Sequence, residues 1–160
     1  MLKCRIIPCL LFKERTIVKS VEFGNMRMVG DPTTCARVFN ERNADELIFL
    51  DIIASRENRQ PNFMVIEDIA RECFMPLSIG GGIRTLEDVD KLFNIGADKV
   101  IVNTSAFKTP ELITHIAHKY GSQAITVSID AKRMNGRYKV FVSCGREEIP
   151  FTPLEWSKEA

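Results

Sequence analysis

The chain has 160 residues, enough for one ordinary domain, and is 45% apolar and 27% charged, as is typical of a soluble globular protein. Its formal net charge of +1 supplies no field that would attract nucleic acid or an anionic membrane. The apolar runs are only strand-sized, and charges begin at Lys3. We therefore expect no transmembrane segment and no signal peptide, and a cytoplasmic location.

The cysteines and histidines offer little support for a metal or a cofactor. The five cysteines are odd in number and none forms a CxxC pair, so we expect reduced, packed thiols rather than disulfides or a zinc site. His115 and His118 lie three apart on an expected helix with no third ligand near them in the sequence. A metal pair is the alternative, but a solvated helix face is the expected reading, and we expect no metal and no cofactor.

Strands and helices are expected to alternate along the chain. Short apolar runs predict strands at 4–11, 46–51, 75–79, 99–103 and 125–130, with a small β excursion at 16–20 and a further strand at 138–143 after the Asn135-Gly136 hairpin signal. Helical spacing and capping residues predict helices at 32–42, 62–72, 86–95 and 110–120, and one that begins near 152. The expected N-caps are Asp31, Thr85 and Thr109.

This order predicts an α/β fold with a parallel sheet. An open doubly wound sheet and a closed barrel both fit this order. However, no GxGxxG motif of a dinucleotide-binding sheet follows the first strand. In addition, polar residues occur at the ends of four strands and do not cluster at a single switch point. Both features favour a (βα)8 TIM barrel, of which the chain would cover about the first five βα units. We therefore expect residues 1–160 to form one barrel domain whose C-terminal part is absent. A second copy that completes the barrel is the alternative.

Glycines and donors follow two neighbouring strands of the expected barrel. Gly80, Gly81 and Gly82 come directly after the third strand and precede a helix, and Asn103 and Thr104 end the next strand. Glycines let a ligand approach backbone N–H groups, and a helix N-terminus attracts anions. These residues predict a phosphate-binding site, although the glycines alone could form a plain tight turn.

Charged residues are expected at both ends of the strands. Asp51 and Asp130 end strands at the predicted mouth, where carboxylates suit acid–base catalysis or, alternatively, cap loop amides. Lys19 lies in the first loop above that mouth. At or near the starts of other strands the sequence has Arg5, Glu46 and Lys99, which would ring the bottom of the barrel. A network that only stabilises the fold is the alternative there.

These motifs resemble the HisF-type cyclase subunit of imidazole glycerol phosphate synthase. The resemblance runs over the whole chain in ordered blocks, which include 5–10, 29–32, 44–52, 80–84, 96–100, 102–104, 121–124 and 129–133. It implies a (βα)8 barrel that pairs with a HisH-like glutaminase. Ammonia from the glutaminase would pass through the barrel and join a bis-phosphorylated ribulosyl intermediate (PRFAR).

The resemblance also implies a role for each candidate residue. Asp130 would be one of two acid–base aspartates, and Lys19 would belong to a loop over the substrate. The glycines at 80–82, with Asn103 and Thr104, would bind one substrate phosphate. Arg5, Glu46 and Lys99 would form the ammonia gate at the glutaminase interface. The second phosphate site would lie in the half of the barrel that this sequence lacks.

One residue departs from the family pattern. The first catalytic aspartate of the family corresponds to Leu11, and a leucine cannot transfer a proton. The sequence around it resembles the glycosyl amidation-associated paralogues of surface-polysaccharide gene clusters. Those paralogues imply a subunit that conducts ammonia to a separate sugar amidotransferase. Two hypotheses therefore stand: an ammonia conduit for sugar amidation, and an authentic cyclase of histidine biosynthesis.

Overall fold

The computed structural model describes residues 4–21 and 24–160. Its strands are β1 Cys9–Lys13, β2 Thr16–Val21, β3 Gly24–Gly30, β4 Leu47–Asp51, β5 Leu77–Gly80, β6 Lys99–Val102, β7 Ile125–Val127, β8 Asp130–Met134, β9 Arg137–Val142 and β10 Glu147–Ile149. Its helices are α1 Pro32–Glu41, α2 Phe63–Glu72, α3 Leu86–Asn94, α4 Thr104–Lys108, α5 Glu111–Tyr120, the 3₁₀ turn η1 Ser122–Ala124 and α6 Pro153–Glu159.

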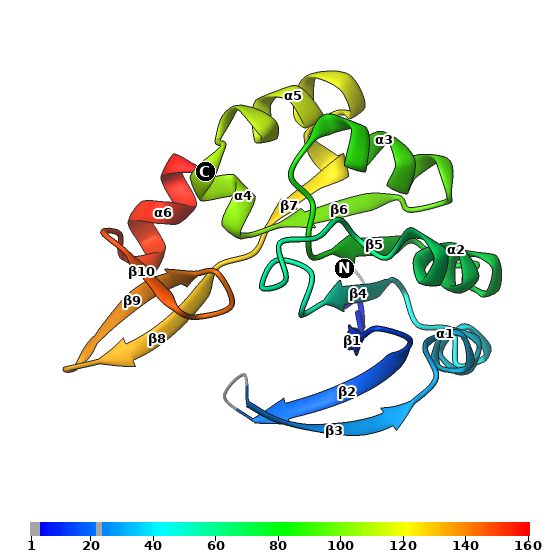
Figure 1. The fold of residues 1–160 in the computed structure, drawn as a ribbon. Helices are drawn as coiled ribbons and strands as arrows, with labels where there is room; N and C mark the ends of the chain where they lie inside the picture. The colour runs from blue at the N-terminus through cyan, green and yellow to red at the C-terminus, as the bar shows by residue number, and fades with distance from the viewer. Residues whose placement is uncertain (1–3, 22–23) are drawn as a thin grey trace.

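Seven strands form one curved sheet in the order β3-β2-β1-β4-β5-β6-β7. β1 and β4 to β7 run parallel, whereas β2 and β3 add an antiparallel excursion beside β1. Helices α1, α2, α3 and α5 line one side of this sheet (Figure 1). The predicted α/β fold is confirmed, and five parallel strands with helices along one side form part of a (βα)8 barrel. A second sheet has the order β10-β9-β8.

The hydrophobic core lies between the parallel strands and the helices. Phe49, Ile79 and Val100 are fully buried on successive strands, and they belong to the same cluster as Ile66 of α2 and Leu92 of α3. Burying one such side chain contributes about 1.5–3 kcal/mol. The side of the sheet that carries these residues is called the outer face below. Within the described residues, no helix is long and apolar enough to span a membrane.

Two of the three predicted N-caps are confirmed. Asp31 accepts a hydrogen bond from the Thr34 N–H and caps α1. Thr85 caps α3 in a capping box, since it accepts from the Asp88 N–H while the Asp88 carboxylate accepts from the Thr85 N–H. These contacts satisfy N–H groups that no helical turn can reach.

We expect Thr85→Ala to lower the free energy of unfolding by about 1 kcal/mol, because the N–H of Asp88 loses its acceptor. Thr114→Ala is the control, since Thr114 is exposed in the middle of α5 and its loss should change stability by only a few tenths of a kcal/mol. Urea unfolding measures both changes. Equal stabilities of the two variants would contradict the capping argument.

The first strand begins later than the sequence predicted. We expected 4–11, whereas β1 is Cys9–Lys13, because the parallel ladder starts where β4 can pair with it and Cys9 lies opposite Ile48. Before it the chain is held by isolated bonds, in which the Ile6 N–H donates to the Asp45 carboxylate and the Pro8 carbonyl accepts from Ile48. The charged start of the chain includes residues 1–3, which lie outside the described residues.

Further differences from the prediction concern two boundaries and one additional helix near the C-terminal ends of the strands. The strand expected at 125–130 ends at Val127, and Asp130 instead opens β8. Helix α4 was not expected, and its five residues directly follow β6. Helix α5 has Pro110 rather than Thr109 at its N-cap, without a side-chain cap bond.

Candidate functional site at the two ends of the parallel strands

The face of the sheet opposite the core carries Gly80 and Lys99 of the candidate residues, and also Leu11. The strand register aligns one row across the five parallel strands: Leu11, Leu50, Gly80, Ile101 and Thr126. A second row lies two residues earlier: Cys9, Ile48, Ser78 and Lys99. Because side chains alternate along a strand, both rows share the face opposite Phe49 and Ile79. This inner face would line the interior of a closed barrel.

The three residues predicted for the ammonia gate meet at the N-terminal end of the inner face. The Glu46 side chain is 7% exposed, and its Oε2 accepts from the Lys99 Nζ at 2.8 Å. Its Oε1 accepts from Arg5, whose side chain is largely exposed. The bond from Lys99 is the main cause that lowers the pKa of Glu46, against the opposing effect of its burial. The structure thus places one buried carboxylate between two cations.

We expect Glu46→Gln to lower the free energy of unfolding by about 1.5–3 kcal/mol at neutral pH, because two charge-assisted bonds are weakened. A carboxylate with a lowered pKa contributes stability above its unfolded pKa and loses it as pH falls through the folded value. The difference between wild type and variant should therefore shrink below about pH 4. Glu67→Gln, in the exposed pair with Arg71, is the control. A difference that persists at low pH would contradict the assignment.

Polar groups gather at the opposite, C-terminal end of the strands. Asn103 directly follows β6 and donates from its Nδ2 to the Ser128 carbonyl at 2.9 Å. The Thr104 hydroxyl accepts from the Ser143 N–H at 3.0 Å. These bonds join the ends of β6 and β7 to the turn between β9 and β10. The residues predicted to bind phosphate thus lie at the end of the sheet away from Glu46.

The glycines at this end are required by close approach and by backbone conformation. Gly81 and Gly82 have φ values of +100° and +78°, which side chains rarely tolerate. A Cβ at Gly81 would lie 2.1 Å from the Asp51 carbonyl oxygen, and one at Gly82 would lie 2.7 Å from the Ala54 Cβ. Gly80 lies on the inner face, where a Cβ would be 2.6 Å from Leu50. The turn is therefore packed directly against the segment that follows β4.

Asp51 lies at this end but not on the inner face. It alternates with Leu47 and Phe49 and therefore belongs to the outer face, where its side chain is fully buried. Its Oδ1 accepts from the Ile53 and Ala54 N–H groups at 3.2 and 3.1 Å, and its two oxygens pair with Arg59 at 2.8 and 3.0 Å. This geometry supports the alternative reading, in which Asp51 caps loop amides, over acid–base catalysis.

Arg59 is the residue that sequence reasoning missed. It lies in the polar loop after β4, where arginines are usually solvated, yet its side chain is only 30% exposed. The one signal for it was Asp51 itself, since a carboxylate that ends a buried strand requires a cation or several donors.

Asp130 is placed at the C-terminal end by a different element from the one expected. It opens β8 opposite Phe141, and burial raises the pKa of its carboxyl. Its charge also helps to raise the pKa of the Cys144 thiol, second to the burial of that thiol. Cys144 in turn lies 3.7 Å from the Ile52 carbonyl, just past β4. Asp130 is half-buried, and its carboxyl favours the protonated form more than that of an exposed aspartate does.

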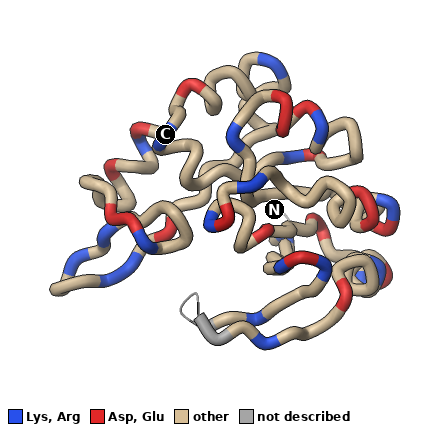
Figure 2. The backbone as a smooth tube through the Cα atoms, in the orientation of Figure 1, with Lys and Arg blue, Asp and Glu red and all other residues tan. Residues whose placement is uncertain are grey.

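Lys19 is exposed on the β2–β3 excursion, directly opposite Arg27. The structure does not bring it into contact with the glycine turn. A similar pair of cations, Lys132 on β8 and Lys139 on β9, lies opposite each other in the second sheet. Figure 2 shows Lys and Arg along both the β2–β3 and the β8–β9 hairpins. No group of three or more His, Cys, Asp or Glu in the described part of the chain could hold a metal ion.

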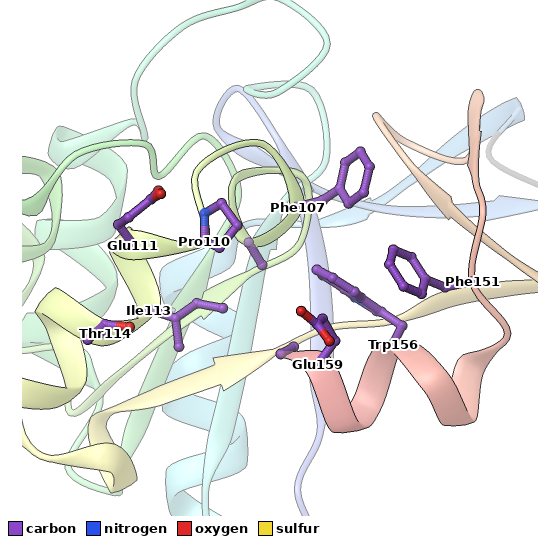
Figure 3. Close-up of a pocket in the computed structure, with 10 residues that line it drawn as sticks. Phe107, Pro110, Glu111, Ile113, Thr114, Phe151, Trp156 and Glu159 are labelled. Carbon is purple, nitrogen blue, oxygen red and sulfur yellow. The ribbon is translucent and has the colours of Figure 1, made fainter.

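A cavity of about 240 Å³ adjoins the glycine turn. Its lining combines hydroxyls with two cations, from three loops and from helix α4 with its C-cap: Ser55, Asn58, Ile83, Arg84, Thr104, Ser105, Lys108, Thr109 and Ser143. A second cavity, of about 390 Å³, lies between α4, α5 and α6. Figure 3 shows Phe107, Phe151 and Trp156 along one part of it. None of the predicted site residues lines that second cavity.

Comparison with known proteins identifies the family of the chain. The protein family described as "Histidine biosynthesis protein" matches residues 5–160. A Pseudomonas aeruginosa protein, provisionally assigned as subunit hisF2 of imidazole glycerol phosphate synthase, is 47% identical over 99% of this chain and 63% of its own length. The HisF subunits of this synthase from Exiguobacterium sp. and Alkaliphilus metalliredigens are 48% and 44% identical over 99% of the chain and 62% and 63% of their own lengths.

The chain thus spans less than two thirds of the length of these curated relatives. Over that span the similarity covers both ends of the strands and the glycine turn. The chain therefore belongs to the histidine-biosynthesis protein family and is HisF-like along its whole length.

Proposed function

We propose that the protein is a HisF-type synthase subunit that conducts ammonia. It would receive ammonia from a HisH-like glutaminase at the N-terminal end of its strands and deliver it to a phosphate-containing site at the other end. The acceptor would be a sugar in surface-polysaccharide synthesis, aminated by a separate amidotransferase in the cytoplasm. The observation that carries the proposal is that Glu46 and Lys99 share the inner face with Leu50 and Gly80 at its opposite end.

The inner face suits the passage of a small neutral molecule. Along its length it presents Ile48, Leu50 and Ile101, with the hydroxyls of Ser78 and Thr126 beside them. A largely apolar lining disfavours the ammonium ion, since an unpaired buried charge is costly, whereas ammonia can pass with one or two hydrogen bonds. The ion cluster at Glu46 would close the N-terminal end and would have to open for transfer.

Leu11 supports the conduit over a cyclase. It lies on the inner face beside Leu50, where the family pattern has an aspartate. Loss of a general acid or base costs about 10²–10⁴-fold in rate, whereas conduction requires no ionisable group at this position. The second candidate is an authentic cyclase of histidine biosynthesis, which the retained Asp130 and its raised pKa favour.

The conduit would be one barrel domain to which residues 1–160 belong. The glycine turn, Asn103 and Thr104 would hold the phosphate of a small-molecule substrate, and Lys19 would approach it from the β2–β3 excursion. Arg5, Glu46 and Lys99 would face the glutaminase.

Glutaminase stimulation tests the gate. The protein should bind a HisH-like glutaminase and accelerate glutamine hydrolysis, followed by glutamate release. Glu46→Gln should reduce the acceleration because the gate loses its charge, while Glu67→Gln on the outer surface of α2 should not. Absence of both complex formation and acceleration with the wild-type protein would refute the proposed partner.

A further inference from the structure

We propose that Arg59 is a positioning residue for the Gly81-Gly82 turn. Acting through Asp51, its guanidinium would hold the loop of residues 52–60 against the turn and so set the geometry of the phosphate site. The inference rests on the proposed function, because it assigns a residue to that same site.

The contact between Arg59 and Asp51 fixes the orientation of both side chains. Arg59 Nη1 and Nη2 each donate to a different Asp51 oxygen, at 2.8 and 3.0 Å. Such a two-pronged contact fixes the orientation of both side chains as well as their distance. The carboxylate is fully buried, so the paired geometry is strongly preferred over a solvated one.

The donors of Arg59 are nearly all used within the loop. Besides the two bonds to Asp51, Nε donates to Glu57 at 3.0 Å and Nη1 also donates to the Gln60 carbonyl at 3.1 Å. A guanidinium has five N–H donors, so these four bonds leave about one for a ligand. Arg59 is therefore suited to shape the site rather than to bind phosphate itself.

The loop that Arg59 holds is in direct contact with the turn. The Asp51 carbonyl leaves no room for a Cβ at Gly81, and the Arg59 carbonyl would lie 2.9 Å from a Cβ at Gly82. The Gly82 N–H points to the Ser55 hydroxyl at 3.4 Å. A shift of the loop would therefore move the amides that a phosphate would use.

The same loop forms one wall of the smaller cavity. Ser55 and Asn58 line it together with Thr104. Arg84, another lining residue, donates from its Nη2 to the Arg59 carbonyl at 3.1 Å. The backbone of Arg59 thus links the loop to Arg84, two residues after the turn. Breaking the bonds of the Arg59 side chain should therefore make both the loop and the turn more mobile.

The test is Arg59→Lys, which keeps the charge and loses the two-pronged contact. Titration with inorganic phosphate in a calorimeter should show affinity reduced about tenfold, the effect of one lost hydrogen bond. Hydrogen exchange, read by NMR without phosphate, should accelerate at the Ala54 and Gly82 amides. Arg71→Lys, in an exposed ion pair on α2, is the control and should change neither quantity.

A double-mutant cycle shows whether Arg59 acts through Asp51. Asp51→Asn should weaken phosphate binding, and adding Arg59→Lys should weaken it little further, because the second change then removes a contact already lost. Fully additive losses would show that Arg59 acts on the ligand directly and would overturn the positioning role.

The exchange measurement separates this inference from the proposed function. If the wild-type protein binds no phosphate, the proposed site fails, but exchange at Gly82 still decides whether Arg59 positions the turn. Wild-type exchange at Gly82 in Arg59→Lys would overturn the inference. Should that variant not fold, Asp51→Leu combined with Arg59→Met removes both charges together, and unchanged Gly82 exchange in the folded double variant would overturn it equally.

Discussion

With PRFAR and excess ammonium salt, the protein should form no measurable imidazole glycerol phosphate, and Leu11→Asp should raise the rate by about 10²-fold or more. The reaction requires proton transfers at two places on the substrate, and a correctly placed acid or base contributes about 10²–10⁴-fold. Position 11 lies on the inner face beside Leu50, so a carboxylate there would face the same space as the substrate. Product absorbance measures the rate without a glutaminase.

Two variants separate the carboxylate from a simple gain of polarity. The asparagine of Leu11→Asn is similar in size to the aspartate of Leu11→Asp but cannot transfer a proton, so this variant should stay inactive. Asp130→Asn added to Leu11→Asp should abolish the gain in rate, because only one of the two acid–base groups is then present. Wild-type turnover equal to that of Leu11→Asp would show that the residue at 11 is not needed and would favour the cyclase.

Gly82→Leu should weaken the binding of inorganic phosphate by about 10²-fold or more. The residue has φ +78°, and its Cβ would meet the Ala54 Cβ at 2.7 Å and the Arg59 carbonyl at 2.9 Å. The backbone of the turn would have to move, and a displacement of about 1 Å can cost about 10²-fold in a site built on geometry. Calorimetric titration of wild type and variant gives the ratio of the two dissociation constants.

Gly136→Leu is the matched control for backbone strain. Gly136 has a similar φ of +80°, but a Cβ there would meet no atom within 4 Å. It lies in the exposed hairpin between β8 and β9. The variant therefore has the backbone strain of a side chain at positive φ but no steric clash, and it should bind phosphate as the wild type does. Equal phosphate affinity in Gly82→Leu would mean that the glycines form only a turn.

The parts of this fold that follow local rules were predictable from the sequence. Asp31 and Thr85 begin helices because their side chains satisfy free N–H groups, and the alternation of apolar strands with capped helices indicates a parallel sheet. The placement of Glu46 and Lys99 at one end also follows, because parallel strands all begin at the same end.

The face of the sheet on which a side chain lies, and its contacts with residues distant in the sequence, were not predictable from local rules. Asp51 ends its strand as expected, but only the register shows that it points to the core side, and only the folded loop shows that Arg59 neutralises it. Asp130 depends on where β7 stops pairing with β6, which is a tertiary property. The late start of β1 has the same cause, since a ladder begins only where its partner strand is present.

The fate of the glutamine amide nitrogen tests the central claim most directly. The complex of this protein with a HisH-like glutaminase would be given glutamine labelled with ¹⁵N at the amide, together with excess PRFAR, and all products would be analysed by mass spectrometry. The conduit account predicts rapid glutamine hydrolysis, ¹⁵N-ammonium free in solution and unchanged PRFAR. Incorporation of ¹⁵N into imidazole glycerol phosphate in proportion to the glutamine consumed would contradict it.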